Sequence, residues 1–201
     1  GGAMALTNAG VFTTDANANV TVNGAFTQVG GGTNSLGGDI TSTTAGIDFL
    51  NAVLLTDTVA MDSNAGGGAI VFQSTLDGTV ADTETLALDS GAGDITFSGA
   101  VGAGTSLGAV TITDAATVNA LGTFTAASFT QVAGTVLTDF QDAVTTTGNF
   151  TFAGTDLRLR DGAHTVGGAM ALTNAGTFTT DAAANVTVNG AFTQVGGGTN
   201  S

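Results

Sequence analysis

The chain has 201 residues, of which 42% are hydrophobic and 32 are glycine, and it contains no proline, cysteine, tryptophan or tyrosine. Sixteen acidic residues against two basic ones give a formal charge of −14, which argues against a nucleic-acid partner because phosphate recognition requires lysine and arginine. The absence of cysteine excludes disulfides and thiolate metal sites. No run reaches the roughly 20 apolar residues of a membrane-spanning helix, so we expect no membrane insertion in this segment.

The start of the chain, residues 1–35, returns almost unchanged as residues 167–201. Only two positions differ between these copies: Thr177 stands in place of Val11, and Ala183 stands in place of Asn17. Self-similarity at a fixed period is typical of proteins that grow by stacking units along one axis. We therefore predict that residues 1–166 form one full repeat unit. Residues 167–201 then start the next repeat in a continuous rod without a linker.

Short stretches of alternating apolar and polar residues follow one another along the whole chain. This alternation predicts half-buried strands, and clear examples lie at residues 20–22, 95–97, 110–113, 150–152, 157–160 and 186–188. Turn signals such as Asn23-Gly24 and Asp161-Gly162 separate the stretches. The two longest glycine-poor stretches, 47–65 and 135–147, lack a sustained 3.6-residue period, so we predict essentially no α-helix.

Large apolar residues recur along the chain at a nearly regular spacing. The series consists of Phe26, Phe49, Phe72, Phe97, Phe124, Phe150, Met170 and Phe192. The mean step of about 24 residues suits one coil of a parallel β-helix with three short strands. We predict an all-β, right-handed β-solenoid with about seven coils in the repeat unit 1–166 and these eight side chains as an internal ladder. A β-sandwich is the alternative, but it explains neither the ladder nor the restart at residue 167.

The only cations of the chain, Arg158 and Arg160, lie close to its single histidine, His164. These residues could form a polyanion- or sugar-binding site, or the Arg/Asp pair of a β-helical polysaccharide-active enzyme. The simpler interpretation is that both arginines point outward and pair with acidic residues about one coil away. Those partners are Asp139 or Asp142 before the strand and Asp181 after it. We favour this interpretation and expect no catalytic residues and no enzymatic activity.

All acidic residues except Glu84 are aspartates, and several of them lie beside glycine. Asp39 and Asp94 each follow glycine and precede isoleucine, and such turn aspartates can bind Ca²⁺ together with backbone carbonyls. They are weak calcium candidates, because aspartate is also an ordinary turn-forming residue. No other cofactor is expected.

Several units share the pattern Gly-x-apolar-Thr-apolar, as in Gly93-Asp94-Ile95-Thr96-Phe97 and residues 108–113, and FTQV occurs at Phe26, Phe129 and Phe192. In this style the chain resembles the repeat regions of large bacterial secreted surface proteins, namely filamentous-haemagglutinin-like and autotransporter-like adhesins. The resemblance implies a right-handed parallel β-helix that is exported and displayed at the cell surface as a stalk or fibre. It carries no functional residue over to this chain.

We therefore expect a structural, extracellular fibre or stalk built from tandem repeats. The alternative is an adhesin that binds glycans or surfaces through its outward loops, and a polysaccharide-active β-helix enzyme is a weaker alternative. The expected partners are further copies of the repeat, in the same chain or head to tail.

Overall fold

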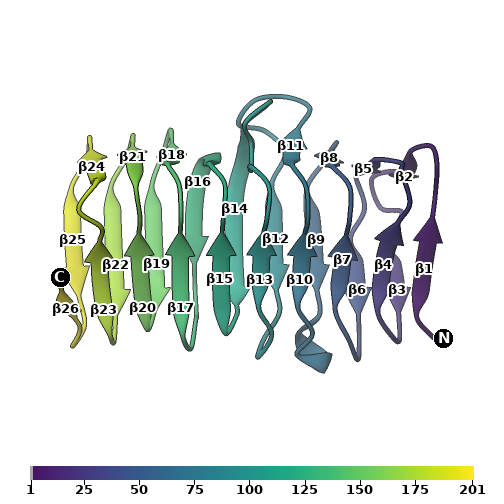
Figure 1. Cartoon of the computed structure of the whole chain (residues 1–201), viewed down its shortest axis with the longest axis horizontal. Helices are drawn as coiled ribbons and strands as arrows, with labels where there is room; N and C mark the ends of the chain where they lie inside the picture. Colours follow the sequence, from purple (N-terminus) through teal and green to yellow (C-terminus); the bar gives the residue numbers. More distant parts are fainter. Residues whose placement is uncertain (1) are drawn as a thin grey trace.

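The computed structural model describes residues 2–201, and its strands wind around one long axis. Neighbouring strands run parallel, as in the pairs of β1 with β4 and of β19 with β22. The strands at the front of Figure 1 run upward while the chain advances from right to left, so the winding is right-handed. The predicted fold, a right-handed parallel β-helix, is confirmed.

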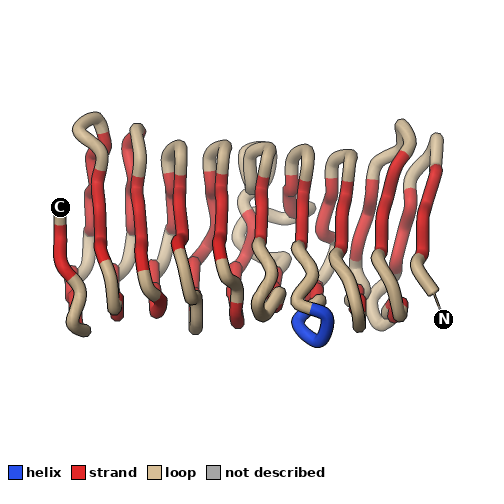
Figure 2. The backbone as a smooth tube through the Cα atoms, turned by 60° about the horizontal axis from the view of Figure 1, so that its bottom comes forward, coloured by secondary structure: helices blue, strands red, loops and turns tan. Residues whose placement is uncertain are grey.

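Three strands per coil build three sheets, which we number in the order in which the chain visits them (Figure 2). Sheet 1 consists of β1 (Met4–Thr7), β4 (Phe26–Val29), β7 (Ile47–Phe49), β10 (Ile70–Phe72), β13 (Ile95–Phe97), β15 (Thr117–Ala120), β17 (Leu137–Phe140), β20 (Asp156–Leu159), β23 (Thr177–Thr180) and β26 (Thr199–Asn200). These ten strands correspond to nine full turns.

Sheets 2 and 3 join at β16 (Phe124–Gln131), a long strand that belongs to both. Sheet 2 consists of β2 (Phe12–Thr14), β5 (Asn34–Leu36), β8 (Val53–Leu55), β11 (Leu76–Gly78), the bridging residue Val101, the first half of β16, β18 (Val144–Thr146), β21 (Gly162–Val166) and β24 (Ala184–Val188). Sheet 3 consists of β3 (Val20–Val22), β6 (Ile40–Ser42), β9 (Val59–Asp62), β12 (Leu86–Asp89), β14 (Leu107–Asp114), the second half of β16, β19 (Phe150–Gly154), β22 (Met170–Asn174) and β25 (Phe192–Val195).

The predicted strands are confirmed, since all six predicted stretches coincide with strands or lie at most one residue beyond them. Within residues 2–201 the single helical element is η1, a 3-10 turn at Asn64–Gly66 that ends at Gly67 with φ 57°. Glycine suits this position because a side chain disfavours positive φ. No helix in the described part of the chain is long and apolar enough to cross a membrane.

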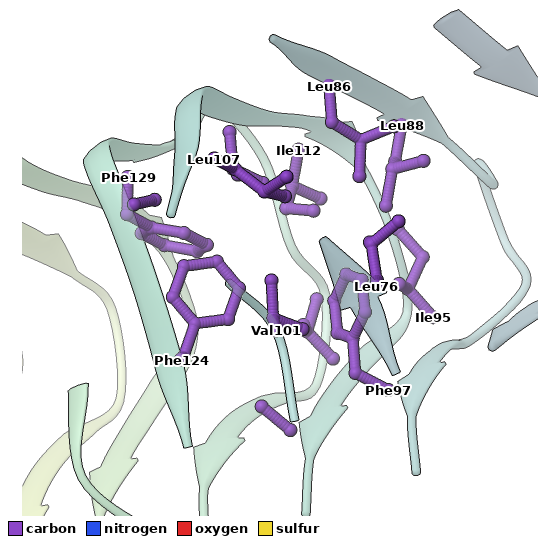
Figure 3. Packing of buried hydrophobic residues seen from close by; sticks show 14 of the residues in the cluster. Leu76, Leu86, Leu88, Ile95, Phe97, Val101, Leu107, Ile112, Phe124 and Phe129 are labelled. Atoms are coloured by element: carbon purple, nitrogen blue, oxygen red, sulfur yellow. The ribbon is translucent and has the colours of Figure 1, made fainter. Parts of the chain in front are cut away.

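Alternation places one set of side chains inside the coils. In β7, for example, Ile47 and Phe49 are fully buried while Asp48 points outward. Figure 3 shows this interior in the middle of the rod, where Phe97 of sheet 1 and Leu76 and Phe124 of sheet 2 point toward one another. Burial of apolar side chains from all three sheets is the main source of stability.

Coil length follows from the register of sheet 1. The successive partners are Met4, Phe26, Ile47, Ile70, Ile95, Val118, Thr138, Leu157, Phe178 and Asn200. The shortest coil runs from Thr138 to Leu157, and the longest runs from Ile70 to Ile95. The variation lies in the turns, where insertions are tolerated.

The repeat period is not a whole number of coils. Seven coils carry the chain from Met4 to Leu157, but the copy of Met4 is Met170, which the chain reaches only after passing through sheet 2 once more. Met4 lies in sheet 1 and Met170 lies in sheet 3, so one period covers seven and two-thirds coils. Equivalent strands of the two copies therefore lie in different sheets: β1 and β22 in sheets 1 and 3, β2 and β23 in sheets 2 and 1, and β3 and β24 in sheets 3 and 2.

Candidate functional site: the junction between repeats

The strands at the end of the first repeat form the platform for the start of the second. β22, β23 and β24 stack on β19, β20 and β21 and continue all three sheets across residue 167. The inward pairs are Phe150 with Met170, Phe152 with Leu172, Leu157 with Phe178, Leu159 with Thr180, His164 with Val186 and Val166 with Val188. The boundary between repeats is thus packed and hydrogen-bonded like any other coil boundary.

Both arginines of the chain lie in this platform, Arg158 on β20 and Arg160 directly after it. The Arg158 guanidinium crosses the boundary and donates to both carboxylate oxygens of Asp181, at 2.9 and 3.2 Å. Arg160 reaches back to β17, where its Nη2 lies 2.7 Å from Asp139 Oδ2. The predicted pairing of each arginine with an aspartate on an adjacent coil is therefore found, with Asp139 rather than Asp142 as the earlier partner. The hydrogen bond to Asp139 raises the pKa of Arg160 above its ordinary value.

His164 is buried below β24 and has a partner for each ring nitrogen. Its Nδ1 accepts a hydrogen bond from the Val144 amide at 3.2 Å, and its Nε2 lies 2.7 Å from the Arg160 carbonyl oxygen. These bonds fit the neutral tautomer with its proton on Nε2. The ring therefore supports the platform from inside, while the two arginines of the same segment lie on its outer surface.

The eight residues of the predicted ladder do not form one column. Two in-register columns exist: Phe49, Phe72 and Phe97 in sheet 1, and Phe150, Met170 and Phe192 in sheet 3. Phe26 also lies in sheet 1 but pairs with Ile47, and Phe124 lies in sheet 2 between Val101 and Val144. The physical reason is that each of the three sheets has inward positions that accept a large side chain. The spacing of the phenylalanines in the sequence therefore does not reveal which sheet each one belongs to.

The phenylalanine rings nevertheless touch from coil to coil. Ring centroids are 5.3 Å apart between Phe26 and Phe49, 5.4 Å between Phe72 and Phe97, and 6.0 Å between Phe97 and Phe124. Separations in this range are typical of favourable aromatic pairs. The path of rings crosses the interior from sheet 1 to sheet 3 instead of following one sheet.

The two calcium candidates lie apart, before β6 and before β13. Asp39 uses its Oδ1 to accept the Ala60 amide at 2.8 Å and borders a polar hollow that also includes Asn19 and Asp57. Asp94 is exposed, and its backbone carbonyl accepts the Ile70 amide. Within residues 2–201 no group of three or more His, Cys, Asp or Glu side chains could hold a metal ion. Calcium binding stays a prediction.

The segment between β11 and β12, residues 79–85, projects beyond the neighbouring turns (Figure 1) and depends on Glu84. The Glu84 carboxylate accepts hydrogen bonds from the Thr79 amide at 3.1 Å, the Val80 amide at 3.0 Å and the Thr79 hydroxyl. Desolvation raises the pKa of Glu84, but these hydrogen bonds outweigh it and leave the pKa below the ordinary value. Sequence reasoning missed this role, and the only signal was that Glu84 is the sole glutamate.

A shallow groove of about 390 Å³ lies beside this projection, on the outer side of sheet 2. Val11, Ser35, Leu54 and Asp77 contribute to its lining, and the side chains of Val11 and Leu54 are exposed. The groove offers a mostly apolar surface with one carboxylate at its edge. A concave, mostly apolar surface with a few polar groups at its edge is typical of small-ligand sites.

Comparisons of the chain with protein-family models, with curated proteins and with solved structures gave no match.

Proposed function

We propose that the chain is part of an extracellular fibre or stalk in which β-solenoid repeats follow one another along one axis. The observation that carries the proposal is the junction, where the second repeat starts on β19–β21 in register and without a linker. Each added coil extends the same backbone hydrogen-bond ladders, so load along the axis is shared by three sheets. The partners of the unit are then further copies of itself.

Charge and composition fit this role. The formal charge of −14 makes parallel rods repel one another sideways, which keeps single fibres apart and soluble. The resemblance to the repeat regions of secreted bacterial surface proteins supports a location outside the cell. Labelling of intact source cells with an antibody against residues 79–85 tests that location, and signal only after lysis contradicts it.

The structural role is tested by chains in which one, two or three further copies of residues 1–166 precede the 201-residue chain. Seven and two-thirds coils at about 4.8 Å each give an expected gain of about 37 Å in rod length per unit. Electron microscopy of the series measures this gain. Particles whose length does not rise with the number of units contradict the proposal.

Adhesion is the second candidate function, and the groove beside Leu54 is the observation that favours it. A glycan array with the unaltered chain and with Leu54→Asp tests it, because a charge in the groove is expected to abolish binding of an apolar sugar face. An enzyme has less support, since Arg158, Arg160 and His164 are all engaged in contacts within the rod.

A further inference from the structure

The first coil of the chain, β1–β3, presents apolar side chains at the N-terminal end of the rod. Met4, Leu6, Phe12 and Val20 pack against the core from one side and remain partly exposed on the other. We call this coil, residues 4–22, the leading coil. Its copy, residues 170–188, is covered on the corresponding side by β19–β21, so that Met170 and Leu172 are fully buried.

The structure thus contains a template for what the leading coil can contact. The same apolar sequence sits on β19–β21 within the chain, and the two differences, at positions 11 and 17, lie at exposed sites outside the inward pairs. If the leading coil sits on β19–β21 in the same register, Phe150 contacts Met4, Phe152 contacts Leu6 and Leu157 contacts Phe12. The surface that fits the leading coil is therefore β19–β21 of a second copy of this chain.

Charge supports the same pairing. Arg158 on β20 is bound by Asp181, which is the copy of Asp15. Asp15 is exposed at the end of β2, and neither of the two ion pairs found within residues 2–201 involves it. On docking, Asp15 takes the place of Asp181 beside Arg158. In a chain with two cations, this is a specific contact.

In the 201-residue chain, however, residues 167–201 already occupy β19–β21. This segment is covered on one side only, and Phe192 and Val195 are exposed to 49% and 61%. A docking copy offers the same contacts from a leading coil that β4–β6 already hold in place. Displacement then releases residues 167–201 from the folded state and returns their conformational entropy, which favours exchange between identical elements.

We propose that the leading coil of one copy docks on β19–β21 of a second copy by displacing residues 167–201, with Arg158 of the second copy bound to Asp15 of the first. The inference deepens the proposed function, because it names the surfaces through which separate copies join end to end. The docking inference can be wrong while the proposed function is right, since units within one chain can stack while separate chains stay apart.

Disulfide trapping tests the contact, because the chain contains no cysteine of its own. Thr151 and Ala171 are register partners between β19 and β22, and Ala5 is the copy of Ala171. Parallel neighbours of this kind lie within the distance that a disulfide spans. Oxidation of a mixture of Ala5→Cys and Thr151→Cys chains is therefore expected to give covalent heterodimers. In the matched control, Thr111→Cys on the outer side of β14 replaces Thr151→Cys and gives no heterodimer.

Two charge reversals then move the yield in opposite directions. Asp181→Arg repels Arg158 within its own chain, so in the Thr151→Cys partner it loosens residues 167–201 and is expected to raise the yield. Asp15→Arg in the Ala5→Cys partner places like charges at the docked junction and is expected to lower the yield about tenfold or more. Asp15→Asn is the milder companion variant, and circular dichroism verifies that each variant keeps its sheet content.

A heterodimer yield no higher than the Thr111→Cys control overturns the inference, as does a yield that Asp15→Arg leaves unchanged. If that result accompanies tandem chains that still lengthen by about 37 Å per unit, the docking inference fails and the proposed function stands. If heterodimers form but tandem chains do not lengthen, the proposed function fails instead.

Discussion

The two copies of the repeated segment, residues 1–35 and 167–201, have nearly the same sequence but lie in opposite surroundings. In the first copy, β4 is covered on both sides, so Phe26 is fully buried, whereas in the second copy its equivalent Phe192 is 49% exposed. The first coils show the reverse, because Met170 is fully buried while Met4 is partly exposed. Burial of a given residue is thus decided by the neighbouring coil and not by the residue itself.

The turn that follows β4 and β25, by contrast, has the same local geometry in both copies. Gln28 donates to Asn8 at 2.8 Å, and Gln194 donates to Asn174 at 2.7 Å. The glycines that follow β4 and β25, Gly30 and Gly196, have φ values of 116° and 111°. These matches hold although β4 belongs to sheet 1 and β25 to sheet 3. This strand and its turn therefore keep the same geometry in whichever sheet they lie.

The largest expected effect separates the second coils of the two copies. Phe26→Ala removes a fully buried ring and should lower the free energy of unfolding by about 3–5 kcal/mol. Phe192→Ala removes a half-exposed ring and should cost less than about 1 kcal/mol. Urea unfolding of the two variants measures the difference. Equal losses would mean that both ends of the rod are covered equally in solution.

The first coils should respond in the opposite order. Met170→Ala opens a cavity between Phe150 and Phe192 and is expected to cost about 2–5 kcal/mol. Met4→Ala should cost much less, because Met4 is packed from one side only. Hydrogen exchange of the amides in β1 and β22 reports each end separately. Faster exchange in β22 than in β1 of the unaltered chain would break the comparison.

Acid should loosen the projection in the middle of the rod, which Glu84 holds in place. The folded pKa of Glu84 lies below its ordinary value, so its stabilising contribution is complete above the unfolded pKa of about 4.3 and is lost as the pH falls through the folded pKa. The amide shifts of Thr79 and Val80, followed by NMR during acid titration, measure this loss.

Glu84→Gln is the matched variant for that titration. It should cost about 1–3 kcal/mol at neutral pH, because hydrogen bonds to a charged acceptor are lost. It should also remove the titration from Thr79 and Val80. Shifts that begin in β22 or β4 would instead place the acid-sensitive group inside one of the copies.

The smallest expected effect concerns one of the two positions at which the copies differ. Asn17 has φ 66°, a conformation that asparagine tolerates better than alanine, whereas Ala183 is not among the positive-φ residues of the described chain. Asn17→Ala should cost about 1 kcal/mol, and Ala183→Asn should change stability by less than about 0.5 kcal/mol. Thermal unfolding curves of the two variants measure both losses of stability. A larger loss for Ala183→Asn than for Asn17→Ala would contradict the conclusion that asparagine is needed at position 17.

Sequence alone predicted most of the architecture, because alternation and self-similarity report directly on strands and stacking. It also predicted the partners of Arg158 and Arg160, since residues about one coil apart lie side by side in a solenoid. The extra two-thirds of a coil in each repeat could not be predicted from the sequence. Long and short coils differ in turns whose lengths leave no periodic signal, and Phe124 and Phe150 look alike in sequence although they lie in sheets 2 and 3.

The extra two-thirds of a coil in each period has a consequence for a long tandem array. Any outward feature that occurs once per unit, such as the projection held by Glu84, is carried to another side of the rod in the next unit. Three such units complete a whole number of coils and bring the feature back to the starting side. Such an array has no single decorated face, so it would meet its surroundings alike from every direction around its axis.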